Sequence, residues 1–404
     1  MPMHDDVDAL VIGAGPAGSS AAILLASAGW RVAIVEKAGF PRRKVCGEYI
    51  SGAAWELLEE LGVGARIASV AGPEVRRVGL FADDVVIDAP MPRAAAFRSG
   101  RALGREHLDT ILLERARACG AIAREGATCA SVRREGEHYR VTVVERGGEA
   151  AVRARVVLGA HGAWEAGTLP THAARSAGAP RDLLGFKAHF RNARLASDLM
   201  PLVLFPGGYG GLVTSDDGRT SLSCCVRREA LARARERHRG ARAGEALLAH
   251  IVEANRGVRA ALAGAQVDGA WLSAGPIRPA IRRFRADGVF AIGNAAGEAH
   301  PIVAEGISMA IQSSFLLCER LARAGRETPE AALAAIAQAY EAAWRRNFAT
   351  RVRAAALFAS LTTHRSTRAL SVRVLAALPS ILTLGAHWSG KDRALRRVTA
   401  MDGA

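Results

Sequence analysis

A glycine-rich motif near the start of the chain carries the clearest chemical signal. Residues 7–12 are apolar and β-prone, and a helical stretch rich in alanine and leucine follows the motif Gly13-Ala14-Gly15-Pro16-Ala17-Gly18. The first glycine of such a motif permits a tight turn, the second lets a pyrophosphate approach the backbone, and the third allows close contact between helix and strand. The free N–H groups at the helix start attract phosphates. We therefore predict a dinucleotide site formed by Gly13, Gly15, Pro16, Ala17 and Gly18.

An acidic residue follows the motif at the distance that such a site requires. Residues 31–35 are predicted as the next parallel strand, which ends in Glu36 with Lys37 beside it. A carboxylate about 20 residues after the motif accepts hydrogen bonds from an adenosine ribose. We assign Glu36 and Lys37 to the nucleotide site. An acid here disfavours a 2′-phosphate, so FAD and NAD remain and NADP does not.

A second motif far downstream distinguishes between FAD and NAD. A short apolar strand ends in Gly293-Asn294, a loop with His300-Pro301 follows, and a helix is predicted to begin near Gly306. Two dinucleotide-like features so far apart in the sequence favour one long cofactor that is held at both ends. The sequence therefore predicts FAD.

These motifs resemble those of a known superfamily over nearly the whole chain. Gly293-Asn294 resembles the FAD-binding Gly-Asp motif of the p-hydroxybenzoate hydroxylase and geranylgeranyl reductase superfamily, and residues 41–48 (PRRKVCGE) are similar to the P-R-x-K-x-C-G segment of geranylgeranyl reductases. The resemblance implies that this segment covers the flavin ring. It implies cofactor contacts for Arg43, Cys46, Gly47, Arg105, Gly293, Asn294, Pro301, Gly306 and Ile307.

One departure from the family bears on the source of electrons. The family commonly has a Gly-Ala-Asp-Gly segment that helps reduction by NAD(P)H, and this chain has His161 at the position of the aspartate. The electron donor is therefore either NAD(P)H itself or a separate reductase.

The spacing of the predicted elements indicates an α/β fold with α+β insertions. We expect a Rossmann-like FAD-binding domain, an inserted antiparallel-sheet substrate domain and C-terminal helices. The FAD-binding domain would comprise residues 1–74, 98–184 and 270–330, the substrate domain 75–97 and 185–269, and the helical region 331–404. Predicted strands of the substrate domain cover 75–80, 85–89, 185–192, 199–205 and 219–226, with helices over 228–255 and then 331–346.

The charge of the chain is uneven. The 404 residues carry a net charge of +15, and residues 350–398 hold nine cations with Asp392 as the one acid. This segment is predicted as amphipathic helices that Pro379 interrupts. They either pack on the FAD-binding domain with a solvated basic face or dock on a membrane surface or an acidic carrier protein. We expect no nucleic-acid partner, because aromatic residues make up only 5% and no recognition motif is present.

Other sequence features narrow the class of protein. No apolar run reaches the roughly 20 residues of a spanning helix, and the polar start of the chain does not resemble a signal peptide. Six cysteines without CxxC spacing argue against a disulfide framework and a zinc site, so we expect no metal. The expected location is cytoplasmic, with peripheral membrane contact left open.

Three residues are candidates for catalysis. Cys46 could donate a proton beside the flavin, or it could be a small buried apolar residue. His300 is either an acid–base group or a loop hydrogen-bonding group. Tyr209, predicted in a Gly-Gly-Tyr-Gly-Gly turn, resembles the tyrosine that lines the substrate site of geranylgeranyl reductases.

Three functions compete. We favour a flavin monooxygenase that hydroxylates a hydrophobic aromatic or polyketide-like substrate. The alternative is a reductase that saturates carbon–carbon double bonds. Cys46-Gly47 supports the reductase. Two departures count against it: Glu48 stands where those reductases commonly have glycine, and Gly211-Leu212-Val213 replaces their aromatic motif. The third function is a flavin-binding protein for electron transfer or docking without turnover of a small molecule.

Overall fold

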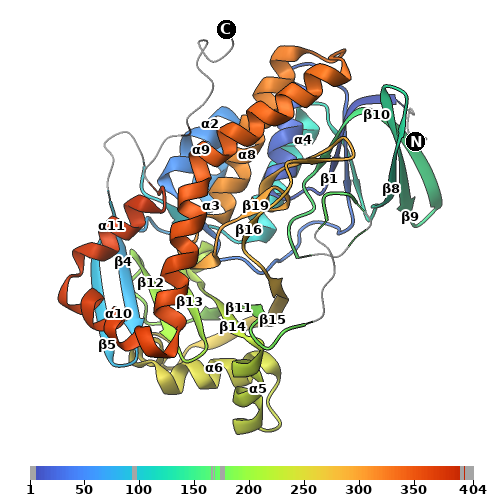
Figure 1. Cartoon of the computed structure of the whole chain (residues 1–404). Helices are drawn as coiled ribbons and strands as arrows, with labels where there is room; N and C mark the ends of the chain where they lie inside the picture. Colours follow the sequence, from blue (N-terminus) through green and yellow to red (C-terminus); the bar gives the residue numbers. More distant parts are fainter. Residues whose placement is uncertain are drawn as a thin grey trace.

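Two β-sheets of different kinds organise the molecule (Figure 1). The computed structural model describes residues 6–92, 98–164, 167, 169–172, 178–391 and 395. One sheet is largely parallel and carries the first glycine-rich motif, and the other is largely antiparallel. This arrangement confirms the α/β fold class, with an antiparallel substrate sheet and C-terminal helices.

The first sheet has the strand order β17-β18-β10-β1-β2-β7, and a hairpin of β8 and β9 extends it through β10. Its strands are β1 (Asp6–Ile12), β2 (Val32–Glu36), β7 (Ile122–Glu125), β8 (Thr128–Glu135), β9 (His138–Glu145), β10 (Gly148–Gly159), β17 (Arg285–Ala286) and β18 (Val289–Ala291). The central strands pair in parallel and are nearly continuous buried apolar runs, as expected for a sheet covered on both faces.

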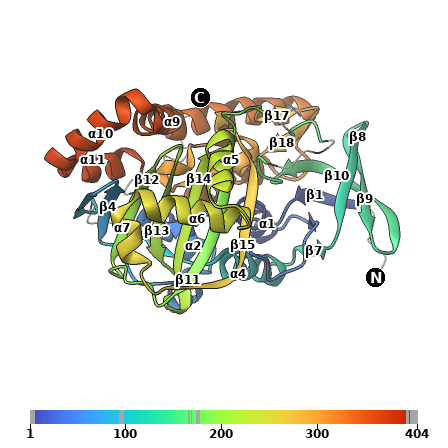
Figure 2. The ribbon, with the colours of Figure 1, turned by 90° about the horizontal axis from the view of Figure 1, so that it is seen from below.

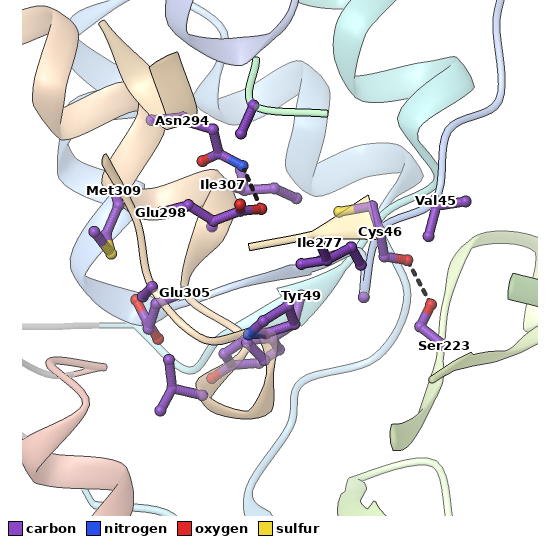
Figure 3. Close-up of a pocket in the computed structure, with 18 of the residues that line it drawn as sticks. Val45, Cys46, Tyr49, Ser223, Ile277, Asn294, Glu298, Glu305, Ile307 and Met309 are labelled. Atoms are coloured by element: carbon purple, nitrogen blue, oxygen red, sulfur yellow. Dashed lines mark hydrogen bonds between the residues drawn. The ribbon is translucent and has the colours of Figure 1, made fainter. Parts of the chain in front are cut away.

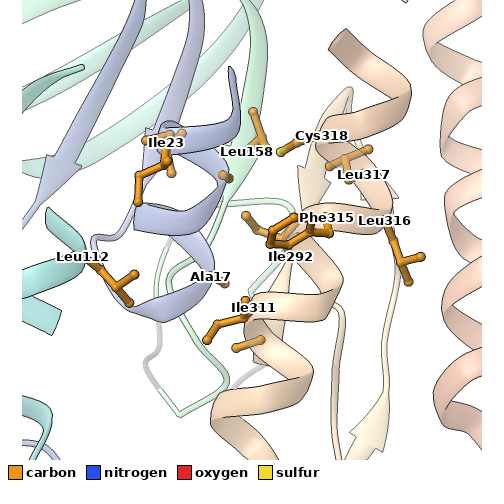
Figure 4. Close-up of a cluster of buried hydrophobic side chains, with 14 of the residues drawn as sticks. Ala17, Ile23, Leu112, Leu158, Ile292, Ile311, Phe315, Leu316, Leu317 and Cys318 are labelled. Carbon is orange, nitrogen blue, oxygen red and sulfur yellow. The ribbon is translucent and has the colours of Figure 1, made fainter. Parts of the chain in front are cut away.

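Two helices that are far apart in the sequence pack together beside this sheet. They are α1 (Pro16–Ser27) and α8 (Gly306–Ala324), and Figure 4 shows Ile292, Ile311 and Phe315 between them. The contact includes Ala17 at the start of α1. The same core therefore places the starts of both helices beside one another. The remaining helices of this part are α2 (Gly52–Glu60), α3 (Gly64–Val70) and α4 (Arg105–Ala118).

The second sheet has the order β15-β11-β14-β13-β12-β4-β5. Its strands are β4 (Arg77–Ala82), β5 (Val85–Pro90), β11 (Leu183–Arg191), β12 (Leu199–Phe205), β13 (Gly208–Thr214), β14 (Thr220–Arg227) and β15 (Gln266–Ile277). Figure 2 shows α5 (Arg228–Arg237), α6 (Ala243–Ala254) and α7 (Arg256–Ala261) along one face of it. Short pairs β3 (Tyr49–Ile50) with β6 (Arg101–Ala102) and β16 (Ala280–Ile281) with β19 (Gly297–Glu298) complete the strands described.

Two expectations for the second sheet differ from the structure. Tyr209 lies on β13 and pairs with Cys225 of β14, so the prediction of a turn there was wrong. The glycines are needed because a Cβ at Gly210 would crowd the Cys224 side chain and the Ser223 carbonyl oxygen of the neighbouring strand. In addition, β15 continues through residue 270, where we expected a domain boundary, because it pairs with β11 as far as Ile277.

Three helices end the described chain: α9 (Glu330–Thr363), α10 (Arg365–Ala377) and α11 (Ser380–Trp388). α9 is longer than the predicted helix 331–346, because Phe348 and Val352 continue its buried face against the core. Pro379 separates α10 from α11, as predicted, and the two helices meet at a bend of 107°. They pack beside β4 and β5 (Figure 1). Asp392, Arg393, Arg396 and Arg397 of the basic segment lie outside the described residues.

Candidate active site

A cavity of about 1160 Å³ extends from the glycine-rich motif to the second sheet. Its wall includes the starts of α1 and α8, the loop after β2, strands β12 to β14, and the C-terminal helices. Figure 3 shows Cys46, Tyr49, Asn294, Glu298 and Glu305 around part of it. Side chains from distant parts of the sequence therefore line one continuous cavity.

The first motif forms one end of this cavity in a way that fits a pyrophosphate. Gly13 has φ of +106°, and a Cβ there would lie 2.7 Å from the Ala160 carbonyl oxygen. A Cβ at Gly18 would overlap the Gly13 carbonyl oxygen. Gly15, Pro16 and Ala17 line the cavity with Gly13, and Gly18 lies behind them in the contact between helix and strand. No side chain among the described residues caps α1, so its first N–H groups are available for phosphate oxygens.

The acidic residue predicted for the ribose also lines this end. Glu36 Oε2 accepts a hydrogen bond from the Ala14 N–H at 2.8 Å, and Oε1 accepts one from the Ala38 N–H at 3.0 Å. These bonds fix the carboxylate beside the motif, and Lys37 lines the cavity next to it. Sequence and structure thus agree in placing Glu36 beside the first motif.

Two arginines of this end form a buried ionic network. Arg105 donates two hydrogen bonds of 2.7 Å to Asp109, and Arg42 lies 3.4 Å from both Glu36 and Asp109. The Nε and Nη1 atoms of Arg42 are buried and have no partner among the described residues. A buried guanidinium with two unused donors suits an anionic group such as a phosphate. The residues of this end therefore fit the phosphates and ribose of FAD.

Arg42, and not the predicted Arg43, faces the cavity. The Arg43 guanidinium leaves the cavity and lies 2.8 Å from His189 Nδ1 and 3.4 Å from the Ala270 carbonyl oxygen. Arg43 is not among the residues that line the cavity, whereas Arg42 is. Nothing in the sequence distinguishes two consecutive arginines, because their directions depend on the loop that carries them.

The second motif and the start of α8 form the other part of the cofactor region. Gly293 has φ of +61° and packs on Ala17, and Asn294, Pro301, Gly306 and Ile307 line the cavity. A Cβ at Gly306 would meet nothing within 4 Å, so the start of α8 opens onto free space. The N-terminus of this 19-residue helix favours a partial negative charge on a group bound there.

Sequence reasoning missed one acidic residue of this region. Glu298 accepts hydrogen bonds from Trp164 Nε1 at 2.8 Å and from Asn294 Nδ2 at 3.2 Å. Burial raises the pKa of Glu298, and the neighbouring Arg282 opposes that shift. The carboxylate therefore holds Asn294 in place.

Glu305 has ionic partners from the C-terminal segment. Its carboxylate accepts hydrogen bonds from Ser51 Oγ at 3.1 Å and from Lys391 Nζ at 3.0 Å. Lys391 Nζ also lies 4.8 Å from the centre of the Tyr49 ring. The residue that precedes α8 is therefore tied to the end of the C-terminal helices, a link that sequence spacing could not indicate.

Cys46 lines the cavity from the loop after β2. It is partly buried, and its Sγ accepts a hydrogen bond from the Glu48 N–H at 3.4 Å. Ser223 of β14 donates a hydrogen bond of 2.6 Å to the Cys46 carbonyl oxygen (Figure 3). Gly47 also lines the cavity, and a Cβ there would meet nothing within 4 Å. The loop is thus fixed to the second sheet while its thiol remains at the cavity.

A buried ionic cluster anchors this same loop. Glu48 is fully buried and contacts Lys187 Nζ, and its Oε2 lies 2.9 Å from His189 Nε2. Burial raises the pKa of Glu48, but His189 and Lys187 outweigh this effect and lower it to about 2. Glu48 has φ of +62°, in the left-handed region that favours glycine. The family's usual glycine would therefore adopt the same backbone readily.

His300 and Tyr209 approach each other at the cavity wall. Their ring centroids are 5.0 Å apart, and His300 Nδ1 is buried without a hydrogen-bond partner among the described residues. Burial lowers the pKa of His300 to about 4, so its imidazole is neutral at pH 7. Burial also raises the pKa of Tyr209 well above 10, and the adjacent Cys225 adds to the shift. His161, also in the wall, has a pKa lowered by burial to about 3.

Comparison with known proteins gives the class of the chain. Residues 6–356 match the family described as FAD binding domain, so the chain belongs to this family of FAD-binding proteins. It is related by sequence to digeranylgeranylglycerophospholipid reductases and shares its fold with flavin monooxygenases. The structure fits this class because both ends of the cavity offer groups that suit FAD.

Two known proteins are similar to the chain in sequence, and a third is similar to it in fold. The chain is 34% identical over 143 residues to a menaquinone reductase of Mycobacterium tuberculosis, and this match covers 35% of each chain. It thus spans about a third of that relative. It is 30% identical over 343 residues to digeranylgeranylglycerophospholipid reductase 1 of Methanopyrus kandleri, which covers 78% of this chain and 79% of the relative. The p-nitrophenol 4-monooxygenase PnpA of Pseudomonas putida has a similar fold, with a TM-score of 0.73, 17% identity, and 98% and 100% of the two chains covered.

Proposed function

We propose that this chain is an FAD-dependent oxidoreductase and, within that class, a reductase that saturates carbon–carbon double bonds of a long apolar substrate. This proposal replaces the monooxygenase that sequence reasoning favoured. The two relatives compared by sequence are named reductases, whereas the monooxygenase shares only 17% identity and supports the fold alone. The departure at Glu48 no longer counts against a reductase, since its backbone is one that glycine adopts.

The observation that carries the proposal is the apolar extension of the cavity. On the side of the second sheet and the C-terminal helices, most of the side chains that line the cavity are apolar. They include Val78, Met200, Leu202, Phe358, Leu375, Ile381, Leu382 and Leu384. Such a wall suits a hydrocarbon chain rather than a small polar ring. An isoprenoid chain, as in the digeranylgeranyl lipid, matches this chemistry.

The chain's own residues would supply the proton. When bound and reduced, FAD supplies a hydride to one carbon of a double bond. The other carbon then needs a proton, and the Cys46 thiol lies in the wall of the cavity. His300 is neutral at pH 7 because its pKa is about 4, so it serves as a hydrogen-bonding group and not as a cationic acid.

Reduction of the cofactor itself requires an outside donor. We propose NAD(P)H or a separate reductase protein. Stopped-flow bleaching of the flavin by NADH and by NADPH separates these two sources, because only a direct donor bleaches it without added protein.

The decisive experiment measures the mass of the product. FAD-loaded enzyme, reduced with dithionite under nitrogen, is mixed with menaquinone or with a digeranylgeranyl phospholipid. We expect a gain of two hydrogen atoms for each double bond reduced, measured after any menaquinol has been reoxidised in air, because dithionite also adds two hydrogen atoms to the quinone ring. A product that gains one oxygen atom only in the presence of O2 would establish the monooxygenase instead. No turnover of either lipid by enzyme with a full complement of FAD would favour an electron-transfer or docking protein.

Cys46→Ala tests the proton donor. We expect normal flavin absorbance and a reduction rate at least about tenfold lower. Cys119→Ala is the matched control, because Cys119 is also partly buried but does not line the cavity. An unchanged rate in Cys46→Ala would exclude Cys46 as the donor and leave the reductase proposal standing.

A further inference from the structure

The C-terminal helices carry most of the large apolar side chains that the molecule exposes. Among the described residues, twelve large hydrophobic side chains are exposed, and seven of them lie between residues 357 and 388. We call these seven the terminal apolar surface: Leu357, Leu361, Leu370, Val374, Leu378, Leu384 and Trp388. Concentration of apolar side chains in one region of a surface marks an interaction site.

The spacing of these side chains places them on single helix faces. Leu370, Val374 and Leu378 recur every four residues along and just beyond α10, and Leu357 and Leu361 do the same near the end of α9. The opposite face of α10 is buried through Val372 and Leu375. Each helix thus buries one apolar face in the protein and exposes a second apolar face to solvent. Packing of the core requires only the buried face.

The lengths of these helices suit a position along a membrane surface. No single helix in the described ranges is long and apolar enough to cross a membrane, while Thr367–Ala377 and Ser380–Trp388 pass that test only as a pair bent by 107°. Short amphipathic helices that lie in the interfacial plane bury only their apolar faces. The pair therefore has the form of an interfacial anchor.

The helices that carry this surface have a charge that is complementary to anionic lipids. The sequence contains no Asp or Glu from residue 342 to residue 391. Arg353 precedes Leu357 by one helical turn, Arg373 adjoins Val374, and both are exposed. Cations beside an apolar helix face strengthen binding to a negatively charged bilayer. A soluble acidic protein would satisfy the arginines but would not account for so much exposed hydrocarbon.

The terminal apolar surface is continuous with the cavity. Leu384 and Trp388 are 54% and 58% exposed, and both also line the cavity wall. An apolar molecule could therefore pass from the surface into the cavity along side chains of α11 without crossing water. Tryptophan is also enriched at membrane–water boundaries.

We propose that α10, α11 and the end of α9 dock on an anionic lipid bilayer, and that the substrate enters the cavity from that bilayer beside Leu384 and Trp388. The entry of substrate rests on the proposed function, whereas the docking does not. Docking places the basic residues at the lipid head groups and the terminal apolar surface among the acyl chains.

The first test is flotation of the full FAD-loaded chain with substrate-free vesicles. Phosphatidylcholine vesicles with phosphatidylglycerol are compared with phosphatidylcholine alone. We expect stronger binding to the anionic vesicles, and a loss of about tenfold or more in Leu370→Glu/Leu378→Glu. Val267→Glu is the matched control, because Val267 is 45% exposed on β15 of the second sheet, and its binding should not change.

Equal binding of the double variant and wild type, or no binding of wild type to either vesicle, would overturn the proposal. Unchanged flavin absorbance and circular dichroism show that each variant is folded. A second assay compares lipid substrate embedded in vesicles with substrate dispersed in detergent. We expect the double variant to lose rate only with vesicles. Vesicle binding without reduction of either lipid would refute the proposed function and leave docking intact.

Discussion

The buried cluster of Glu48, Lys187 and His189 allows us to predict how substitutions of Glu48 and Lys187 change the free energy of unfolding. Glu48 and His189 have no exposed surface and Lys187 is 1% exposed. Glu48→Gln removes the negative charge and leaves the Lys187 ammonium buried without its counter-ion. Breaking a buried ion pair on one side costs about 3 to 5 kcal/mol. The lowered pKa of Glu48 gives a consistent figure, since a change from 4.5 to about 2 corresponds to about 3 kcal/mol.

The assay is urea unfolding of the FAD-loaded wild type and variants at pH 7. We expect Glu48→Gln to lower the free energy of unfolding by about 3 kcal/mol. Glu48→Gln/Lys187→Met should recover at least about half of that loss, because it leaves no uncompensated charge. Glu149→Gln is the control, since Glu149 is exposed and the change there should stay within about 0.5 kcal/mol.

The sign of the pH dependence provides an independent check. The pKa of Glu48 is lower in the folded chain than in the unfolded chain, so its contribution is fully present above pH 4.5 and is lost as the pH falls toward 2. The difference between wild type and Glu48→Gln should therefore shrink below pH 4.5. A loss below about 1 kcal/mol at pH 7, or losses that simply add in the double variant, would refute the account of the cluster as one coupled unit.

Three further predictions concern the cofactor and the cavity. Gly18→Ala should lose bound FAD after desalting, because a Cβ there overlaps the Gly13 carbonyl oxygen. The control Gly147→Ala should keep its FAD, because a Cβ there would meet nothing within 4 Å. Equal flavin content in the two variants would contradict this prediction. Arg42→Met should weaken FAD binding by about ten- to a hundredfold in a fluorescence titration, since the phosphates of FAD lose two buried donors, and Arg43→Met should leave the affinity nearly unchanged. The reaction rate of His300→Gln should have the same pH profile as that of the wild type between pH 6 and 8, because the pKa of His300 is about 4. Loss of a break near pH 6.5 in the variant would show instead that this histidine titrates there.

The first dinucleotide motif was predictable from the sequence because its physics is local. A tight turn, a close backbone approach and a helix start all depend on residues within six positions of one another. The same holds for Pro379, which ends α10 wherever that helix lies in the fold. These features follow from backbone sterics and from the spacing of apolar residues.

Other parts of the site could not be predicted, because they depend on side chains that meet across the fold. The choice of Arg42 over Arg43, the cluster around Glu48, and the bond between Lys391 and Glu305 each join segments from different elements. Tyr209 was placed in a turn because its glycines suggest one, although they serve the close approach of β13 to β14.

The sequence by itself thus determined that the chain binds FAD through a Rossmann-like domain and that its C-terminal segment is basic and helical. Only the tertiary structure decided that the cofactor region, the loop of Cys46 and the C-terminal helices enclose one cavity. The reason is that local patterns act over one or two turns, while a cavity depends on which faces of distant elements are buried together. Likewise, only the structure shows that the basic C-terminal helices expose apolar side chains beside that cavity.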